Sequence, residues 1–274
     1  MALSNHAIRI VVAIIAIPIV LAASYLGGWY FFFFVLTISL SSFYEFSIMS
    51  KLKGANPNLF IGALGVVVIL LNQYRVFFSI WNFVIFYMAL ILFVELFRNK
   101  GSVLLNVGVT LLGVFYLGLF GSTIIAIREF YPNLPGLYDR GGFIIISTLA
   151  SIWICDSAAF WSGSSFGKHK LFPRVSPNKS WEGAIFGFVF AILTMIAAKF
   201  IILEFLTLKD AILIGVIIGF IGQVGDLVES LIKRDAGVKD SSALIPGHGG
   251  MFDRFDSLFF SAPIIYLYLT YIGR

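Results

Sequence analysis

The sequence predicts an all-α protein: a polytopic membrane helix bundle of about nine transmembrane helices, with a cytoplasmic N-terminus. Three observations carry this prediction. Of the 274 residues, 59% are hydrophobic and only 12% are charged, and the mean hydropathy is +0.97. A soluble domain contains about 25% charged residues, so most of this chain is expected to lie in lipid.

Nine apolar stretches come near the length that crosses a hydrocarbon core, which is about 17–25 residues. We expect helices at residues 8–26, 29–49, 59–71, 76–97, 103–127, 142–161, 184–205, 211–232 and 252–272. The first resembles a secretory signal because Ala22, Ala23 and Ser24 follow its apolar run. That run is long, however, and a second span follows at once, which favours a retained helix. The third stretch is short, so a re-entrant or tilted segment is the alternative there.

The basic residues are distributed unevenly over the connections between these stretches. With a cytoplasmic N-terminus, every even-numbered connection is cytoplasmic, and these connections hold most of the Lys and Arg residues. The basic residues in the cytoplasmic connections are Lys51, Lys53, Arg98, Lys100, Lys168, Lys170, Arg174, Lys179, Lys233, Arg234, Lys239 and Arg254. By the positive-inside rule, this asymmetry favours nine spans with the C-terminus outside.

The net charge and the cysteine usage exclude several classes of function. A net charge of +5 could indicate a nucleic-acid partner, but the basic residues lie in short loops between apolar spans, so we expect no nucleic acid. The single cysteine, Cys155, excludes an internal disulfide and a multi-cysteine zinc site.

The carboxylates divide the chain near residue 140. Residues 1–140 carry theirs at or near span ends, as Glu45, Glu95, Glu129 and Asp139. We therefore expect a transmembrane scaffold of about five helices there. Residues 141–274 are expected to form a catalytic region of about four helices with two cytoplasmic loops.

The most polar stretch runs from residue 230 to residue 256 and concentrates Asp, Lys, Arg and Gly, and Asp226 and Glu229 lie just upstream of it in an apolar run. Carboxylates ligate hard cations and basic side chains neutralise phosphate oxygens, so this mixture predicts a polyphosphate bound with a divalent metal. The glycines of the turn at 246–250 allow backbone N–H groups to approach an anion. A solvated connection between helices is the alternative, but it does not explain Asp226, which lies inside a span at an energetic cost.

Four polar residues at the end of the eighth span share one helix face. Asp226, Glu229, Ser230 and Lys233 are spaced i, i+3, i+4 and i+7. Asp226 is therefore expected about 10 Å below the start of the loop. A polar site that is sunken in the bilayer and open to the cytosol suits a reaction between a soluble nucleotide and a lipid.

The second polar loop, residues 155–183, faces the same side. Its sequence from Ser162 to Lys168 differs in spacing from a P-loop and follows no strand, so nucleotide hydrolysis of that type is not expected. Ser180 is a candidate cap for the seventh helix, with Glu182 in its first turn. The basic residues of this loop either satisfy the positive-inside rule or bind a lipid headgroup or triphosphate, and the loop alone leaves both open.

The spaced motifs Ser230, Lys233-Arg234, Lys239-Asp240, 246–250 and 253–256 resemble the signature of the phosphatidate cytidylyltransferases, or CDP-diacylglycerol synthases. The segments 155–171 and 176–183 look like a second conserved block of that family. The resemblance is sharp over residues 153–257. Residues 1–140 resemble the family only in being apolar spans.

The resemblance implies that CTP and phosphatidate react to give CDP-diacylglycerol and pyrophosphate, with Mg²⁺, as two metal ions, at the cytoplasmic face of a bacterial inner membrane. It also implies a homodimer. The lipid phosphate would attack the α-phosphorus of CTP without a protein nucleophile. Metal ions and basic side chains would offset the repulsion between the two anions.

Individual roles follow from matching these motifs. We expect Asp226 and Asp253 to ligate metal, with Asp256 and Asp156 as the next candidates. The expected phosphate contacts and substrate-binding residues are Lys233, Arg234, Lys239, Arg254, Ser176, Lys179, Gly247, His248, Gly249 and Gly250. His248 is expected to act as a hydrogen-bonded turn residue rather than as a general base.

Two other functions remain open from the residues alone. A CTP-dependent polyprenol or dolichol kinase would need a similar site and would transfer the γ-phosphate instead. A cation transporter could use Asp226 beside the glycine stripe Gly215, Gly219, Gly222 and Gly225, although close helix packing also explains such a stripe. The clustering of charge at one end of the spans argues against transport.

Overall fold

The computed structural model describes residues 5–247 and 249–273. Within these residues the chain forms nine continuous helices, two of which contain a π-helical turn, so each expected helix is present. They are α1 (Asn5–Leu26), α2 (Gly28–Lys51), α3 (Leu59–Tyr74), α4 (Ile80–Leu96), α5 (Val103–Gly113) continuing through η1 (Val114–Leu119) into α6 (Phe120–Arg128), α7 (Asp139–Phe166), α8 (Trp181–Ile201), α9 (Leu208–Ile217) continuing through η2 (Ile218–Gly222) into α10 (Gln223–Asp235), and α11 (Phe252–Tyr271).

Five of these helices are long and apolar enough to cross a membrane. They are Gly28–Lys51, Val103–Arg128, Asp139–Phe166, Trp181–Ile201 and Leu208–Asp235. Shorter apolar helices cover Ile10–Leu26, Leu59–Tyr74 and Ile80–Leu96. In Trp181–Ile201 only 17% of an apolar stretch of 18 residues is buried inside the protein. A helix that is apolar all round yet exposed is suited to lipid, so the fold is that of a polytopic membrane protein.

A short β-hairpin in the second polar loop was not expected. Strands β1 (Lys170–Phe172) and β2 (Ser176–Ser180) pair antiparallel, with Phe172 opposite Ser176. The strands are too short and too polar to show alternating hydrophobicity, which is the signal that predicts a strand. The loop is also shorter than expected, because α7 continues to Phe166 instead of ending at residue 161. The expected cap at Ser180 is confirmed, since its side chain accepts a hydrogen bond from Gly183 N.

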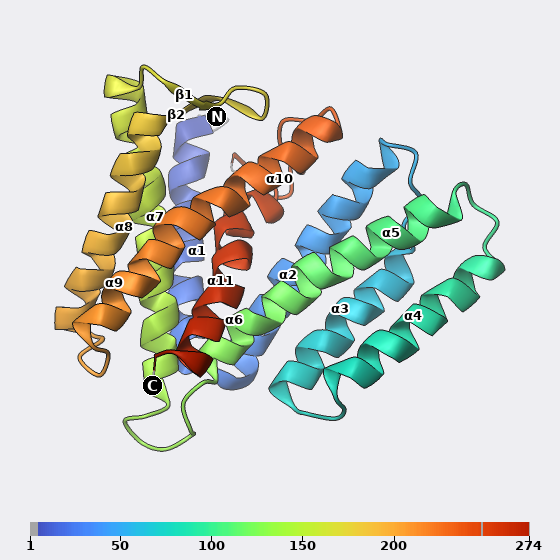
Figure 1. Cartoon of the computed structure of the whole chain (residues 1–274), viewed down its shortest axis with the longest axis horizontal. Helices are drawn as coiled ribbons and strands as arrows, with labels where there is room; N and C mark the ends of the chain where they lie inside the picture. The colour runs from blue at the N-terminus through green and yellow to red at the C-terminus, as the bar shows by residue number, and fades with distance from the viewer. Residues whose placement is uncertain (1–4, 248, 274) are drawn as a thin grey trace.

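The polar segments gather at one end of the bundle (Figure 1). The hairpin, the N-terminal end of α1, the C-terminal end of α10 and the first turn of α11 lie toward this end. Helix α11 runs through the middle of the molecule and packs against α2, α6, α7 and α10. Its residues Phe252, Phe259, Ala262 and Ile265 are fully buried. The first turn of α11 is therefore held rigidly beside α10.

The glycine stripe of α9, η2 and α10 has a packing explanation. A Cβ atom on Gly215 would lie 2.7 Å from the Ile192 Cα atom, and one on Gly219 would lie 3.0 Å from the Phe188 Cα atom. On the other side, a Cβ atom on Gly225 would lie 2.9 Å from the backbone oxygen of Asp256. Gly215 and Gly219 let α8 pack closely against α9 and η2, and Gly225 lets α11 pack closely against α10. The stripe therefore gives no independent support to a cation pathway.

Candidate active site

Three carboxylates from α10 and α11 meet at the polar end of the bundle. One oxygen from each of Asp226, Glu229 and Asp256 lies within 4.8 Å of the other two. Glu229 is 1% exposed and Asp256 is 9% exposed. Buried carboxylates at this spacing repel one another unless a cation is present. Three hard oxygen donors match the preference of Mg²⁺, so the donor set fits a divalent metal.

The predicted polar face of α10 is confirmed. Ser230 Oγ donates to Asp226 Oδ1 at 3.4 Å, and Lys233 Nζ lies 2.6 Å from Glu229 Oε2. From β2 of the hairpin, Lys179 forms an ion pair with Asp226. The hairpin thus brings a lysine to the carboxylate cluster. The expected contact of Lys179 with substrate stays a prediction.

Lys233 also joins the carboxylate cluster to the loop that precedes α11. Its Nζ lies 2.6 Å from Asp253 Oδ1, and the Lys233 side chain is only 12% exposed. The other oxygen of Asp253, Oδ2, accepts hydrogen bonds from Gly250 N at 2.8 Å and from Ser241 N at 3.0 Å. Asp253 therefore holds Lys233 and the glycine turn together. Its expected role as a metal ligand stays a prediction.

A cavity of about 600 Å³ opens between α7, the hairpin, α8 and α10, beside Asp226. The expected residues Asp156, Ser176 and Lys179 line this cavity, together with Asp226. Asp156 interacts electrostatically with Asp226, Lys179 and Arg254, and Asp256 interacts with both Asp226 and Asp156. The three predicted metal-ligand candidates other than Asp253, which are Asp226, Asp256 and Asp156, thus form one group, and Glu229 joins it.

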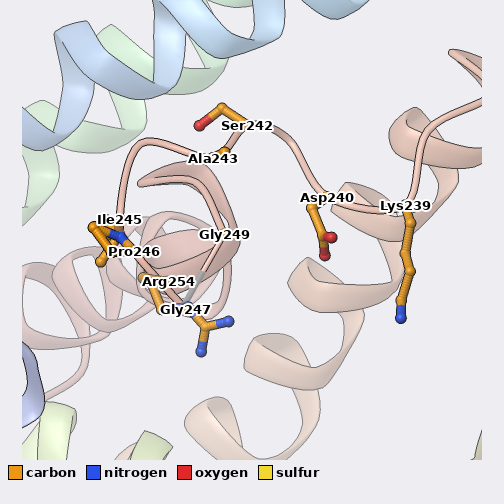
Figure 2. Close-up of a pocket in the computed structure, with 9 residues that line it drawn as sticks. All are labelled: Lys239, Asp240, Ser242, Ala243, Ile245, Pro246, Gly247, Gly249 and Arg254. Carbon is orange, nitrogen blue, oxygen red and sulfur yellow. The ribbon is translucent and has the colours of Figure 1, made fainter. Parts of the chain in front are cut away.

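A second cavity of about 580 Å³ lies under the loop between α10 and α11. Figure 2 shows Lys239 and Asp240 on one side of it and Pro246, Gly247 and Arg254 on the other. Gly247 and Gly249 have φ values of +75° and +82°, which glycine adopts without strain. Because the cavity has two basic side chains and a glycine turn, it is suited to an anion.

Two predicted site residues, Arg234 and Gly250, line neither of these cavities. Arg234 donates to the backbone oxygens of Val175 at 3.2 Å and Val238 at 3.0 Å, so it joins α10 to the hairpin. Gly250 lies beside the anion cavity and donates its N–H to Asp253. His248 lies outside the described residues.

Sequence reasoning missed Glu45 of α2. This carboxylate is 2% exposed and accepts four hydrogen bonds, from Ser241 Oγ at 3.0 Å, Ser242 Oγ at 2.6 Å, Met251 N at 2.9 Å and Phe252 N at 2.8 Å. It therefore ties the middle of the loop that forms the anion cavity, at Ser241 and Ser242, to the start of α11. An ionisable residue inside an apolar helix is the signal that could have identified it.

Comparison with known proteins identifies the family. The chain matches the cytidylyltransferase family over residues 7–272. It is similar to proteins named phosphatidate cytidylyltransferase: 31% identical to that of a Synechocystis strain, with 96% of each chain covered, and 33% identical to that of Staphylococcus aureus strain COL, with 96% of this chain and 98% of the relative covered. The Staphylococcus haemolyticus protein of the same name is 32% identical over the same shares. The chain therefore belongs to the cytidylyltransferase family.

Proposed function

We propose that this protein is a phosphatidate cytidylyltransferase that uses CTP. In the proposed reaction, a phosphate oxygen of phosphatidate attacks the α-phosphorus of CTP. The new bond joins the two phosphates, and the bond from the α-phosphorus to the β-phosphate bridge breaks, so CDP-diacylglycerol and pyrophosphate result. The observation that carries the proposal is the carboxylate cluster Asp226, Glu229 and Asp256, which lies between two lysines at the polar end of a membrane bundle.

The residues present fit bound Mg²⁺. Asp226, Glu229 and Asp256 would hold it, with Asp156 and Asp253 as further candidates from the sequence, and we propose two ions. Bound metal would supply positive charge that offsets repulsion between the lipid phosphate and the triphosphate. Glu229 was not among the expected ligands, and it is proposed here on its distance to the two aspartates.

The basic side chains have distinct proposed roles around this cluster. Lys179 on the hairpin and Lys233 on α10 lie far apart in the sequence, yet both contact the carboxylates. They are therefore placed to neutralise phosphate oxygens once a metal ion is bound to the carboxylates. Lys239 and Arg254 line the anion cavity and would bind phosphate groups there. Asp253 would keep Lys233 in position through its 2.6 Å ion pair.

We further propose that all nine helices cross the membrane, with the N-terminus in the cytoplasm. The uneven distribution of basic residues supports this orientation, which places the hairpin and the anion cavity in the cytosol. On this account residues 141–274 contain the chemistry and residues 1–140 support it. A homodimer in a bacterial inner membrane completes the proposal.

The direct test uses detergent-purified protein with phosphatidate, CTP and Mg²⁺. Mass spectrometry of the lipid fraction is expected to find CDP-diacylglycerol. This product should form only when phosphatidate, CTP and Mg²⁺ are all present with the protein. In a parallel reaction with a polyprenol in place of phosphatidate, a phosphorylated polyprenol without cytidine would indicate a lipid kinase instead. Absence of any lipid product would contradict both enzymatic functions.

A further inference from the structure

An apolar groove of about 550 Å³ runs along the bundle beside the anion cavity. Its lining comes from α1, α2, α7 and α11 and includes Ala16, Ile38, Trp153 and Phe255. Among the described residues that line it, Arg254 is the charged one. The groove therefore offers a hydrocarbon surface that ends at a basic side chain.

Arg254 and Ile245 line the anion cavity as well as the groove. The two spaces are thus neighbours that share one arginine and one apolar residue. Arg254 also interacts electrostatically with Asp156, which lines the cavity beside the carboxylate cluster. A phosphate at Arg254 would therefore lie where the groove meets the anion cavity.

The dimensions of the groove fit one leaflet. Its lining on α1 runs from Val12 to Val20, which at the helical rise corresponds to about 12 Å. This is less than half of a hydrocarbon core about 30 Å thick. Arg254 lies in the first turn of α11, at the polar end of the bundle. The apolar lining therefore extends from the level of a headgroup toward the middle of the bilayer.

We propose that this groove binds one acyl chain of phosphatidate and that Arg254 binds the phosphate of the same molecule. The inference rests on the proposed function and specifies where its lipid substrate is held. An apolar surface that ends at an arginine is complementary to a lipid with an anionic headgroup, since the arginine stem packs on hydrocarbon while its guanidinium meets the phosphate. A lipid with a neutral headgroup gains nothing from the arginine.

A steric variant with a matched control tests this placement. Ala16 of α1 lines the groove, whereas Ala22 on the same helix is also exposed and lies outside the lining. Ala16→Trp is expected to raise the KM for dioleoyl phosphatidate about tenfold, because each methylene that loses its burial weakens binding. The same variant should leave the KM for CTP and the turnover of dihexanoyl phosphatidate within about twofold, and Ala22→Trp should change none of these.

Equal KM values for dioleoyl phosphatidate in Ala16→Trp, Ala22→Trp and the parent protein would overturn the proposal. So would an equal loss with the long-chain and short-chain lipids. If the parent protein itself transferred no cytidylyl group to either lipid, the proposed function would fail instead, and the two failures are therefore distinct.

A second measurement needs no enlarged side chain and no turnover. Trp153 lines the groove, and the difference in fluorescence between the parent protein and Trp153→Phe isolates its signal. Phosphatidate with brominated acyl chains, added at low mole fraction, is expected to quench this signal more strongly than brominated phosphatidylcholine at the same mole fraction. Equal quenching by the two lipids would mean that the groove holds bulk lipid only and would overturn the proposal.

Discussion

Glu45 Oε1 accepts a hydrogen bond of 2.6 Å from Ser242 Oγ, although the two residues are 197 positions apart in the chain. The same carboxylate accepts hydrogen bonds from Met251 N and Phe252 N, at the start of α11. A carboxylate at a helix N-terminus stabilises the helix by satisfying N–H groups that have no partner within it. One residue of α2 thus fixes the loop that lines the anion cavity, and the N-terminal half of the chain takes part directly in forming the site.

Glu45→Gln is expected to lower both stability and activity. The amide nitrogen of Gln cannot accept hydrogen bonds, so buried donors lose their partner at a cost of about 1–3 kcal/mol each. Glu95→Gln is the matched control, because Glu95 is also buried but bonds to Asn106 and Arg98 at a distance from the site. Melting temperature and kcat/KM of the folded enzyme are the measurements. Equal kcat/KM in both variants would mean that Glu45 does not position the loop.

Lys233→Met is expected to destabilise the protein strongly, because it leaves Glu229 and Asp253 without their shared cation. Removing one partner of a buried ion pair lowers the free energy of unfolding by about 3–5 kcal/mol, because the other charge stays buried without compensation. The double variant Lys233→Met/Glu229→Gln should recover part of this stability while it stays inactive. Thermal unfolding and turnover of the three proteins test this. Full activity in the double variant would exclude both a phosphate contact by Lys233 and metal binding by Glu229.

Asp226→Asn and Asp256→Asn are each expected to raise the Mg²⁺ concentration needed for half-maximal activity by at least about tenfold, the equivalent of about 1.4 kcal/mol in lost affinity. Asp235→Asn is a suitable control, since Asp235 is 67% exposed and pairs with Lys53 at the surface. Activity measured against Mg²⁺ concentration gives the comparison. An unchanged Mg²⁺ requirement in both aspartate variants would exclude them as ligands.

Asp253→Asn separates two roles for this residue. If Asp253 positions Lys233 and the glycine turn, the variant should fold and insert normally and lose turnover at every Mg²⁺ concentration. If Asp253 is a metal ligand, as the sequence predicts, higher Mg²⁺ should restore part of the turnover. The same Mg²⁺ titration distinguishes these results, and near-normal activity would contradict both roles.

The helices could be predicted because a membrane span must contain a long apolar run, and the polar face of α10 could be predicted because i, i+3 and i+4 spacing defines a helix face. The contact between Glu45 and the loop could not be predicted, since it depends on how α2 packs against residues nearly 200 positions away. The hairpin was missed because its strands are too short for a periodic signal. The pairing of Lys233 with Asp253 likewise depends on the close approach of α10 and α11 at Gly225.

The fate of the individual phosphates of CTP tests the central claim most directly. Purified protein is given phosphatidate, Mg²⁺ and CTP that is labelled separately at the α- and γ-phosphates. The account predicts α label in the lipid and γ label in released pyrophosphate, with both signals reduced in Asp256→Asn at the Mg²⁺ concentration that half-saturates the parent protein. The appearance of γ label in a lipid, with CDP as the second product, would contradict it.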